Sequence, residues 1–126
     1  MKRSKAGILE QLARAGLDLG ADVLEVEYRD GHEEVVAYLG AVGREIARLR
    51  RGSSQATELR HDLYATKRRL LRFNARGQEY GLRAEVYDNF GEDAFRIELC
   101  ALARGSGRSN NEMQQTGGAR RRPRSA

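Results

Sequence analysis

The sequence is poor in features that assign a chain to a protein class at once. It has one cysteine, Cys100, so it cannot form an internal disulfide, and we expect a reducing, cytoplasmic compartment. No apolar run approaches the roughly 18 residues of a membrane-spanning helix, so we expect no membrane insertion. The remaining composition, with 40% hydrophobic and 33% charged residues over 126 positions, is ordinary for one soluble globular domain.

Catalytic signatures are also missing. The sequence contains none of the patterns CxxC, HExxH, GxSxG, GxGxxG or GxxxxGK[ST]. The two histidines have no reason to meet, because His32 lies at a predicted hairpin tip and His61 lies within a predicted helix. Cys100 ends the last predicted strand, where we expect a buried structural thiol rather than a nucleophile. We therefore predict no enzyme activity, no catalytic residues and no cofactor.

The excess positive charge of the chain, +5, lies at its C-terminal end. Residues 1–102 contain 17 Lys/Arg and 17 Asp/Glu, whereas residues 103–126 contain six arginines and one acid. This end is polar and nearly free of large apolar residues, so we predict a disordered basic tail over 103–126. We predict that the remaining residues, 1–102, form a single α+β domain. Four clustered arginines make the tail a candidate binder of nucleic acid or anionic lipid, with an incidental C-terminus as the alternative: Arg120, Arg121, Arg122 and Arg124.

The clearest local pattern is Asp30-Gly31 between two apolar-patterned runs, which predicts a β-hairpin with a two-residue turn. The turn fixes the register, with Arg29 opposite His32, Tyr28 opposite Glu33, Val26 opposite Val35 and Leu24 opposite Ala37. Strand alternation then sends six side chains to the core: Leu24, Val26, Tyr28, Val35, Ala37 and Leu39. The second face is acidic near the turn and apolar further away, with Val23, Glu25, Glu27, Glu34, Val36 and Tyr38.

The glutamates of that second face need a compensating charge. Glu27 lies directly opposite Glu34, which is unfavourable for two like charges. Glu25 adds a third carboxylate, and such a cluster can hold a metal ion, but carboxylate metal sites usually draw on loops, so we predict no metal. We expect a solvated or arginine-paired face, with Arg44 and Arg48 of the following segment as the partners.

The flanking segments predict two helices. Ser4 is a candidate N-cap of the first helix, and Gly16 suits its C-terminal end. Gly52-Ser53-Ser54 precedes the second helix, whose apolar stripe consists of Ala56, Leu59, Leu63, Thr66 and Leu70. Its exposed side carries Arg60, Lys67 and Arg68, for which we expect solvation rather than phosphate contact.

The remaining segments predict strands. Residues 41–51 fit either a helix or a strand, and their glycines favour a strand over 44–49. Three further strands follow the second helix, with turns at 75–77 and 88–91. The order α-β-β-(β)-α-β-β-β predicts an α+β fold with two helices packed on a mostly antiparallel sheet of about five or six strands.

Several short motifs resemble the small domain that precedes the motor domain in type II secretion and type IV pilus assembly ATPases. The similar positions are Gly20-Ala21, Leu24, Val26, Glu27, Asp30-Gly31, Leu82-Arg83, Gly91-Glu92 and Arg96. The match spans roughly residues 6–99, but Glu25 replaces a family histidine, and Ala37 and Tyr38 replace the arginines that the family uses near phosphates. Because a phosphate-binding GxxxxGK[ST] loop is missing as well, the resemblance implies an isolated docking domain without ATP hydrolysis.

Three functions follow from these patterns. The first is a protein-interaction or regulatory module that binds an unknown protein or a second copy through Val23, Val36 and Tyr38, because one core does not need apolar residues on both hairpin faces. The second is a nucleic-acid-binding protein that acts through the arginine-rich tail. The third is a small-molecule sensor with a ligand between the sheet and the helices.

Overall fold

The computed structural model describes residues 7–102. The predicted order of elements is confirmed, and the ambiguous segment is a strand. The elements are α1 (Ile8–Asp18), β1 (Val23–Arg29), β2 (His32–Leu39), β3 (Val42–Arg50), α2 (Ser54–Thr66), β4 (Leu71–Ala75), β5 (Gln78–Asn89) and β6 (Glu92–Ala101). Ser4 and the predicted tail, with Arg120, Arg121, Arg122 and Arg124, lie outside the described residues.

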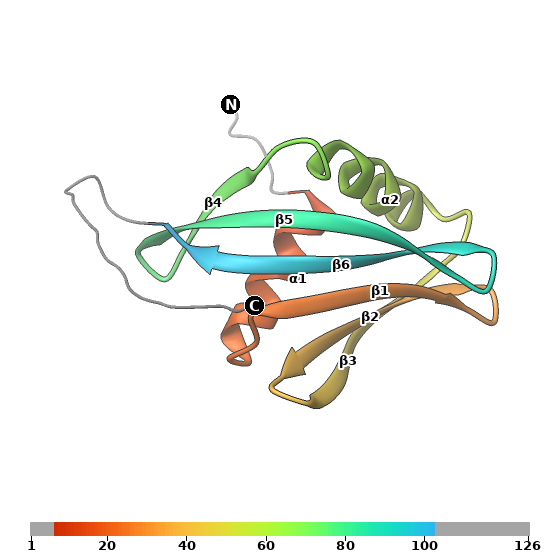
Figure 1. The fold of residues 1–126 in the computed structure, drawn as a ribbon, viewed down its shortest axis with the longest axis horizontal. Helices are drawn as coiled ribbons and strands as arrows, with labels where there is room; N and C mark the ends of the chain where they lie inside the picture. The colour runs from red at the N-terminus through yellow and green to blue at the C-terminus, as the bar shows by residue number, and fades with distance from the viewer. Residues whose placement is uncertain (1–6, 103–126) are drawn as a thin grey trace.

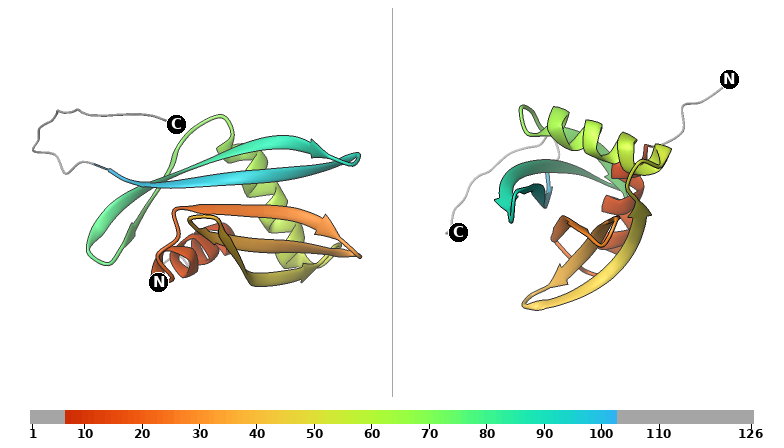
Figure 2. Two further views of the ribbon diagram at one scale, coloured as in Figure 1. Left: turned by 60° about the horizontal axis from the view of Figure 1, so that its bottom comes forward. Right: turned by 90° about the vertical axis from the view of Figure 1, so that its right-hand side faces the viewer.

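All six strands form one antiparallel sheet in the order β3-β2-β1-β6-β5-β4. The sheet therefore consists of two three-stranded halves that join where β1 pairs with β6. Within residues 7–102, both helices cover the same face of the sheet, and no helix covers the other, which we call the open face (Figures 1 and 2). This is the predicted α+β architecture, with six strands in the described residues 7–102. Within residues 7–102, no helix is long and apolar enough to cross a membrane.

The predicted hairpin register is confirmed pair by pair. Asp30 and Gly31 form the turn with φ angles of 52° and 81°, the positive values that a two-residue hairpin needs. Phe90 and Gly91 repeat this geometry at the β5–β6 turn, with φ of 55° and 83°. Two core assignments are wrong: Leu39 is 37% exposed, because β2 ends there beside the next turn, and Tyr28 is only partly buried and lies outside the core cluster.

The first helix ends later than predicted. Gly16 is buried inside α1 and does not end it, while Gly20, with φ of 92°, supplies the left-handed residue after the helix. A Cβ at Gly16 would lie 2.6 Å from Leu24 Cδ2, so this glycine permits close approach of α1 to β1. The N-cap of α1 is Gly7, and the Ile8 backbone N–H donates to Glu58 Oε2 of α2 at 3.1 Å.

The core lies between the helices and the covered face of the sheet. Its fully buried side chains come from both helices and from β1, β2, β5 and β6, and the largest are Phe95, Leu9, Leu24, Leu59, Leu63, Leu82 and Ile97. Ser53 caps α2, since its hydroxyl accepts from the Ala56 N–H at 3.1 Å. Leu70, predicted within α2, lies beyond its end and covers Gly81, where a Cβ would meet Leu70 at 3.0 Å.

Candidate interaction surface on the open face

The open face of the sheet carries the candidate site. The strand register aligns its side chains in two rows that each cross β5, β6, β1, β2 and β3. One row is Arg83, Glu98, Val23, Tyr38 and Gly43, and the other is Glu85, Arg96, Glu25, Val36 and Glu45. The face therefore mixes charged residues at its sides with apolar and aromatic residues over β1 and β2.

The structure brings together the three residues that the sequence predicts for binding. Val23 pairs with Tyr38 across β1 and β2, and Val36 lies two residues before Tyr38 on the same strand. All three are partly exposed. Val23 and Tyr38, but not Val36, border a hollow of about 350 Å³ that is lined by Asp22, Val23, Glu25, Tyr38, Gly40, Ala41 and Arg96. The charged residues of this lining are Asp22, Glu25 and Arg96.

Tyr38 is held in place by a glycine on the neighbouring strand. Gly43 of β3 is its direct cross-strand partner. A Cβ at Gly43 would come within 2.9 Å of both Tyr38 Cε1 and Val36 Cγ1. The missing side chain therefore makes room for the tyrosine ring, which covers the backbone of the edge strand in return. Tyr38 remains partly exposed on the open side of the sheet.

A second tyrosine approaches the same carboxylates from the other half of the sheet. Tyr87 of β5 pairs with Ala94 of β6, which is buried. Because Ala94 is small, the Tyr87 side chain reaches across it, and its hydroxyl donates to Glu27 Oε2 at 3.2 Å. We name the set Val23, Glu25, Glu27, Val36, Tyr38 and Tyr87 the tyrosine–glutamate patch.

The pKa values of the two tyrosine hydroxyls in this patch are raised. Partial burial, the charges of Glu25 and Glu27 and the hydrogen bond to Glu27 raise the pKa of Tyr87 to about 12. The pKa of Tyr38 is raised as well, mainly by burial and next by the charge of Glu25. Burial disfavours a charge of either sign, whereas the negative charges of Glu25 and Glu27 favour a cation, so the two carboxylates make the patch suited to a cation.

The Tyr87 shift predicts how the protein responds to alkali. Because its pKa lies near 12 in the folded state and near 10 in an unfolded chain, Tyr87 stabilises the fold below about pH 10, and this contribution is lost as the pH rises toward 12. We expect Glu27→Gln to move the Tyr87 titration toward lower pH. Absorbance titration of tyrosinate, with Tyr87→Phe to assign the signal, measures this; an unmoved titration would show that Glu27 does not set the potential.

Arginines pair with the glutamates, in part as the sequence predicts. Arg48 Nε lies 3.5 Å from Glu34, which confirms one predicted partner, and Arg96 Nη1 lies 3.9 Å from Glu25. The prediction for Arg44 is wrong: this residue pairs with Ala37, so it belongs to the helix-covered side of β3. The reason is a bulge beside Val35 and Val36, which shifts the alternation along β3. Residues 7–102 contain no group of three metal-ligating side chains.

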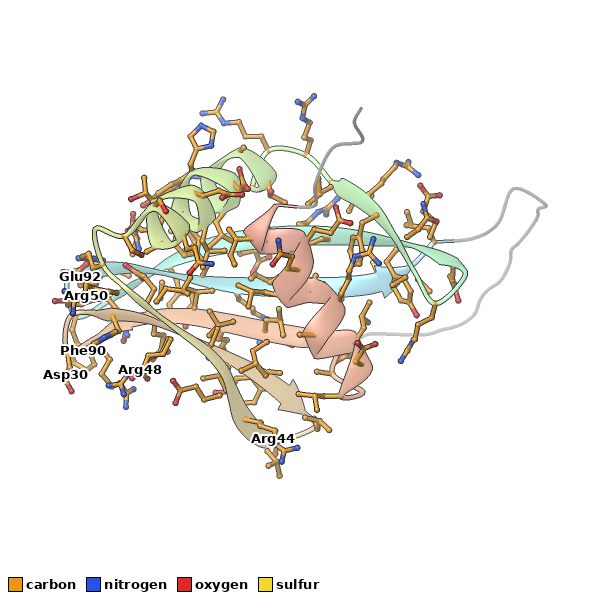
Figure 3. All side chains as sticks on the ribbon, turned by 180° about the vertical axis from the view of Figure 1, so that it is seen from behind. Asp30, Arg44, Arg48, Arg50, Phe90 and Glu92 are labelled. Atoms are coloured by element: carbon orange, nitrogen blue, oxygen red, sulfur yellow. The ribbon has the colours of Figure 1, made fainter. Side chains whose placement is uncertain are left out.

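The outer edge of β3 is poorly suited to strand pairing. It has the bulge described above and carries Arg44, Arg48 and Arg50, all exposed (Figure 3). Bulges and charged side chains are the devices by which edge strands avoid pairing with other chains. A partner is therefore better accommodated on the open face than along this edge.

A buried carboxylate that the sequence does not single out lies on the opposite side of the hairpin. Glu33 is fully buried, and its two oxygens accept from Arg51 Nε at 2.9 Å and Arg60 Nη1 at 3.2 Å. Arg60, predicted to be solvated, is thus a partner of a buried acid, whereas Lys67 and Arg68 are exposed as predicted. The Arg51 guanidinium also lies 3.9 Å from the centre of the Tyr28 ring.

The arginines extend this cluster to the β5–β6 hairpin. Arg51 Nη2 lies 3.0 Å from Glu92, and Arg60 Nη2 donates to the Tyr64 hydroxyl at 3.3 Å. The Tyr64 hydroxyl in turn donates to Asp93. The cluster therefore ties β2, α2 and the start of β6 together at one end of the molecule, and it acts as a structural support for the hairpins that form the open face.

The cysteine and the two histidines do not lie together in one site. Cys100 is exposed, contrary to the prediction of a buried thiol, because alternation along β6 sends Leu99 to the core and Cys100 to the open face. Partial burial and the charge of Glu98 raise the pKa of its thiol, which opposes nucleophilic activation. His32 lies at the hairpin tip, with Nδ1 3.0 Å from the Asp30 carbonyl, and His61 is exposed on α2.

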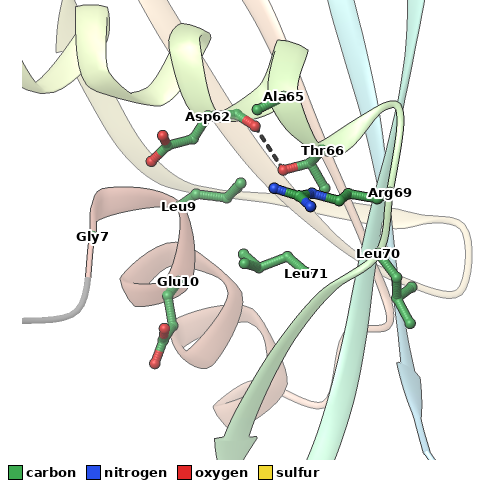
Figure 4. A pocket seen from close by; sticks show the side chains of 9 residues that line it. All are labelled: Gly7, Leu9, Glu10, Asp62, Ala65, Thr66, Arg69, Leu70 and Leu71. Atoms are coloured by element: carbon green, nitrogen blue, oxygen red, sulfur yellow. Dashed lines mark hydrogen bonds between the residues drawn. The ribbon is translucent and has the colours of Figure 1, made fainter.

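A second hollow, of about 250 Å³, lies between the start of α1, the end of α2 and β4 (Figure 4). Its lining consists of Gly7, Leu9, Glu10, Asp62, Ala65, Thr66, Arg69, Leu70 and Leu71. The Thr66 hydroxyl donates to the Asp62 carbonyl at 2.6 Å and is thereby occupied. This is where the predicted small-molecule site between sheet and helices would be sought first, but its polar groups do not select a ligand class.

Comparison with known proteins does not assign the chain to a family. No protein-family model matches the chain, and no curated protein matches its sequence.

Proposed function

We propose that this chain is a non-enzymatic protein-interaction module of a reducing, cytoplasmic compartment, whose open sheet face binds an extended, arginine- or lysine-rich segment of a partner protein. The observation that carries the proposal is the tyrosine–glutamate patch. Two partly exposed tyrosines flank Glu25 and Glu27 on a face that the helices leave open (Figure 2), and partial burial together with the charges of these carboxylates raises both tyrosine pKa values.

The chemistry of the patch fits guanidinium groups best. A carboxylate accepts two parallel hydrogen bonds from an arginine, and a tyrosine ring attracts the same cation by about 0.5–1 kcal/mol at an exposed site. Val23 and Val36 provide apolar surface for the aliphatic stem of such a side chain. The patch thus places carboxylates beside tyrosine rings, so one arginine side chain can pair with a carboxylate and stack on a ring at the same time.

The spacing of the patch fits an extended segment. Successive open-face residues on one strand lie two positions apart, about 6.6 Å along the strand, which is also the spacing of same-side residues in an extended peptide. Glu25 and Glu27 have this spacing on β1. A segment lying along β1 with a basic residue at every second position therefore places one cation near each carboxylate.

Peptide selectivity tests the proposal. We expect a labelled peptide of about eight alternating arginine and serine residues to bind with a Kd in the range of about 10–100 μM near 50 mM salt, where exposed charges are weakly screened. The matched peptide with glutamate in place of arginine should bind at least about tenfold more weakly. Fluorescence anisotropy measures both affinities; equal affinities, or a preference for the glutamate peptide, would overturn the proposal.

The resemblance to the accessory domain of secretion and pilus ATPases stays a prediction, and it suggests where a partner would be found. Subunits of such a machine would be the first proteins to search for a basic extended segment. A secretion or pilus operon around the gene would support this source, whereas an unrelated genomic setting would argue against it.

A further inference from the structure

The charge of the chain is divided between the described domain and the C-terminal segment. Residues 7–102 contain 14 Lys/Arg and 17 Asp/Glu, a net charge of −3, whereas residues 103–126 contain six arginines and one glutamate, a net charge of +5. Four of those arginines fall within five positions, in the sequence RRRPR of residues 120–124. The chain itself therefore contains an arginine-rich segment, which is the kind of ligand proposed for the tyrosine–glutamate patch.

The described domain ends beside that patch. Glu98 near the end of β6 pairs with Val23, and the Leu99 N–H donates to the Asp22 carbonyl at 2.9 Å. Asp22 and Val23 line the open-face hollow. The C-terminal segment thus leaves the sheet at the end where the hollow lies.

The connection is long enough for the arginines to reach the patch. Residues 103–119, 17 in number, separate Leu102 from Arg120. At about 3.3 Å per residue, 17 residues reach at most about 56 Å. The seven residues of β1 extend over about 23 Å, which is well within that reach. Tethering at such a distance gives an effective concentration on the order of millimolar, so even a weak contact competes with a separate partner.

We infer that the segment 120–124 binds the tyrosine–glutamate patch of its own chain and thereby competes with the basic segment of a partner. This inference rests on the proposed function, because it assigns a regulator to the same surface. Its chemistry is the pairing of Arg120, Arg121, Arg122 and Arg124 with Glu25 and Glu27, with stacking on Tyr38 and Tyr87. A modification or ligand that neutralises the arginines would free the patch.

Paramagnetic relaxation in the full-length chain tests the contact. A nitroxide is attached to Ser125→Cys in a Cys100→Ser background, which leaves one thiol. At about 50 mM salt, where the Debye length exceeds 10 Å, we expect amide signals of Glu25, Glu27, Val36 and Tyr38 to lose more than about half their intensity, while those of Arg14 and Glu58 on the helices change little. The loss should disappear when the four tail arginines are replaced by glutamine. Equal broadening on the helical side, or broadening that survives this replacement, would overturn the inference.

Competition separates this inference from the proposed function. The arginine–serine peptide should bind the full chain with the four arginine-to-glutamine changes about fivefold or more tighter than it binds the wild type, because the tethered competitor is lost. Equal binding to both chains would overturn the inference and leave the proposed function standing. Binding to neither chain would overturn the proposed function.

Discussion

Reversing the charge of the patch, with Glu25→Lys and Glu27→Lys together, should weaken binding of the arginine–serine peptide by about 100-fold near 50 mM salt. Each substitution replaces an attraction between a carboxylate and a peptide arginine with a repulsion between two cations. Like-charge contacts at an interface cost several kcal/mol, which is enough to account for a 100-fold loss of affinity, or about 2.7 kcal/mol. Both glutamates are only partly buried on the open face, so the fold tolerates the change. Anisotropy titration of the labelled peptide against both proteins gives the ratio of affinities.

A control variant separates local contact from the effect of net charge. Glu10→Lys and Asp18→Lys change the total charge by the same amount, but both residues lie on α1, on the other face of the sheet. Because charges more than a Debye length apart are largely screened, we expect this variant to lose less than about threefold in affinity. Similar losses in the two variants would place binding away from the patch.

Removing the buried carboxylate, with Glu33→Ala, should lower the free energy of unfolding by about 3 kcal/mol. Breaking a buried ion pair typically costs 3–5 kcal/mol because the partner charges lose their compensation, and the partial exposure of Arg51 and Arg60 places this case at the lower end. Urea denaturation followed by circular dichroism measures the loss.

The neighbouring Glu34 provides the matched control for that prediction. Its carboxylate also meets two arginines, Arg29 at 3.7 Å and Arg48 at 3.5 Å, but both arginines are more than half exposed. Surface pairs contribute at most about 1 kcal/mol, so Glu34→Ala should cost about 1 kcal/mol or less. If Glu33→Ala is no more destabilising than Glu34→Ala, the cluster around Glu33 does not support the hairpins.

Local sequence signals predict the hairpins well. Asp30-Gly31 fixes the turn, the register and hence the faces, because positive φ and the period of two leave little freedom. The positions of Val23, Val36 and Tyr38 on the open face follow from this register alone. The face of Cys100 also follows from alternation with Leu99, so the prediction of a buried thiol neglected a signal that was present.

Long-range packing limits the rest of the prediction. Glu33 has its place in the predicted register, but its partners come from α2 and from the loop before it, 27 and 18 positions away respectively. The end of α1 depends on how closely Gly16 approaches Leu24, which no local pattern specifies. The segment of β3 is ambiguous because it lies at an exposed edge and contains a bulge, so its apolar residues follow no regular period.

The most direct test of the central claim is to locate the basic peptide on the molecule. Backbone amide chemical shifts of the full-length chain with the four tail arginines changed to glutamine are followed while the unlabelled arginine–serine peptide is added. We predict that the largest shifts fall on Val23, Glu25, Glu27, Val36, Tyr38 and Tyr87, with little change on α1 and α2. Shifts centred on the helices or on the outer edge of β3 would contradict binding at the tyrosine–glutamate patch.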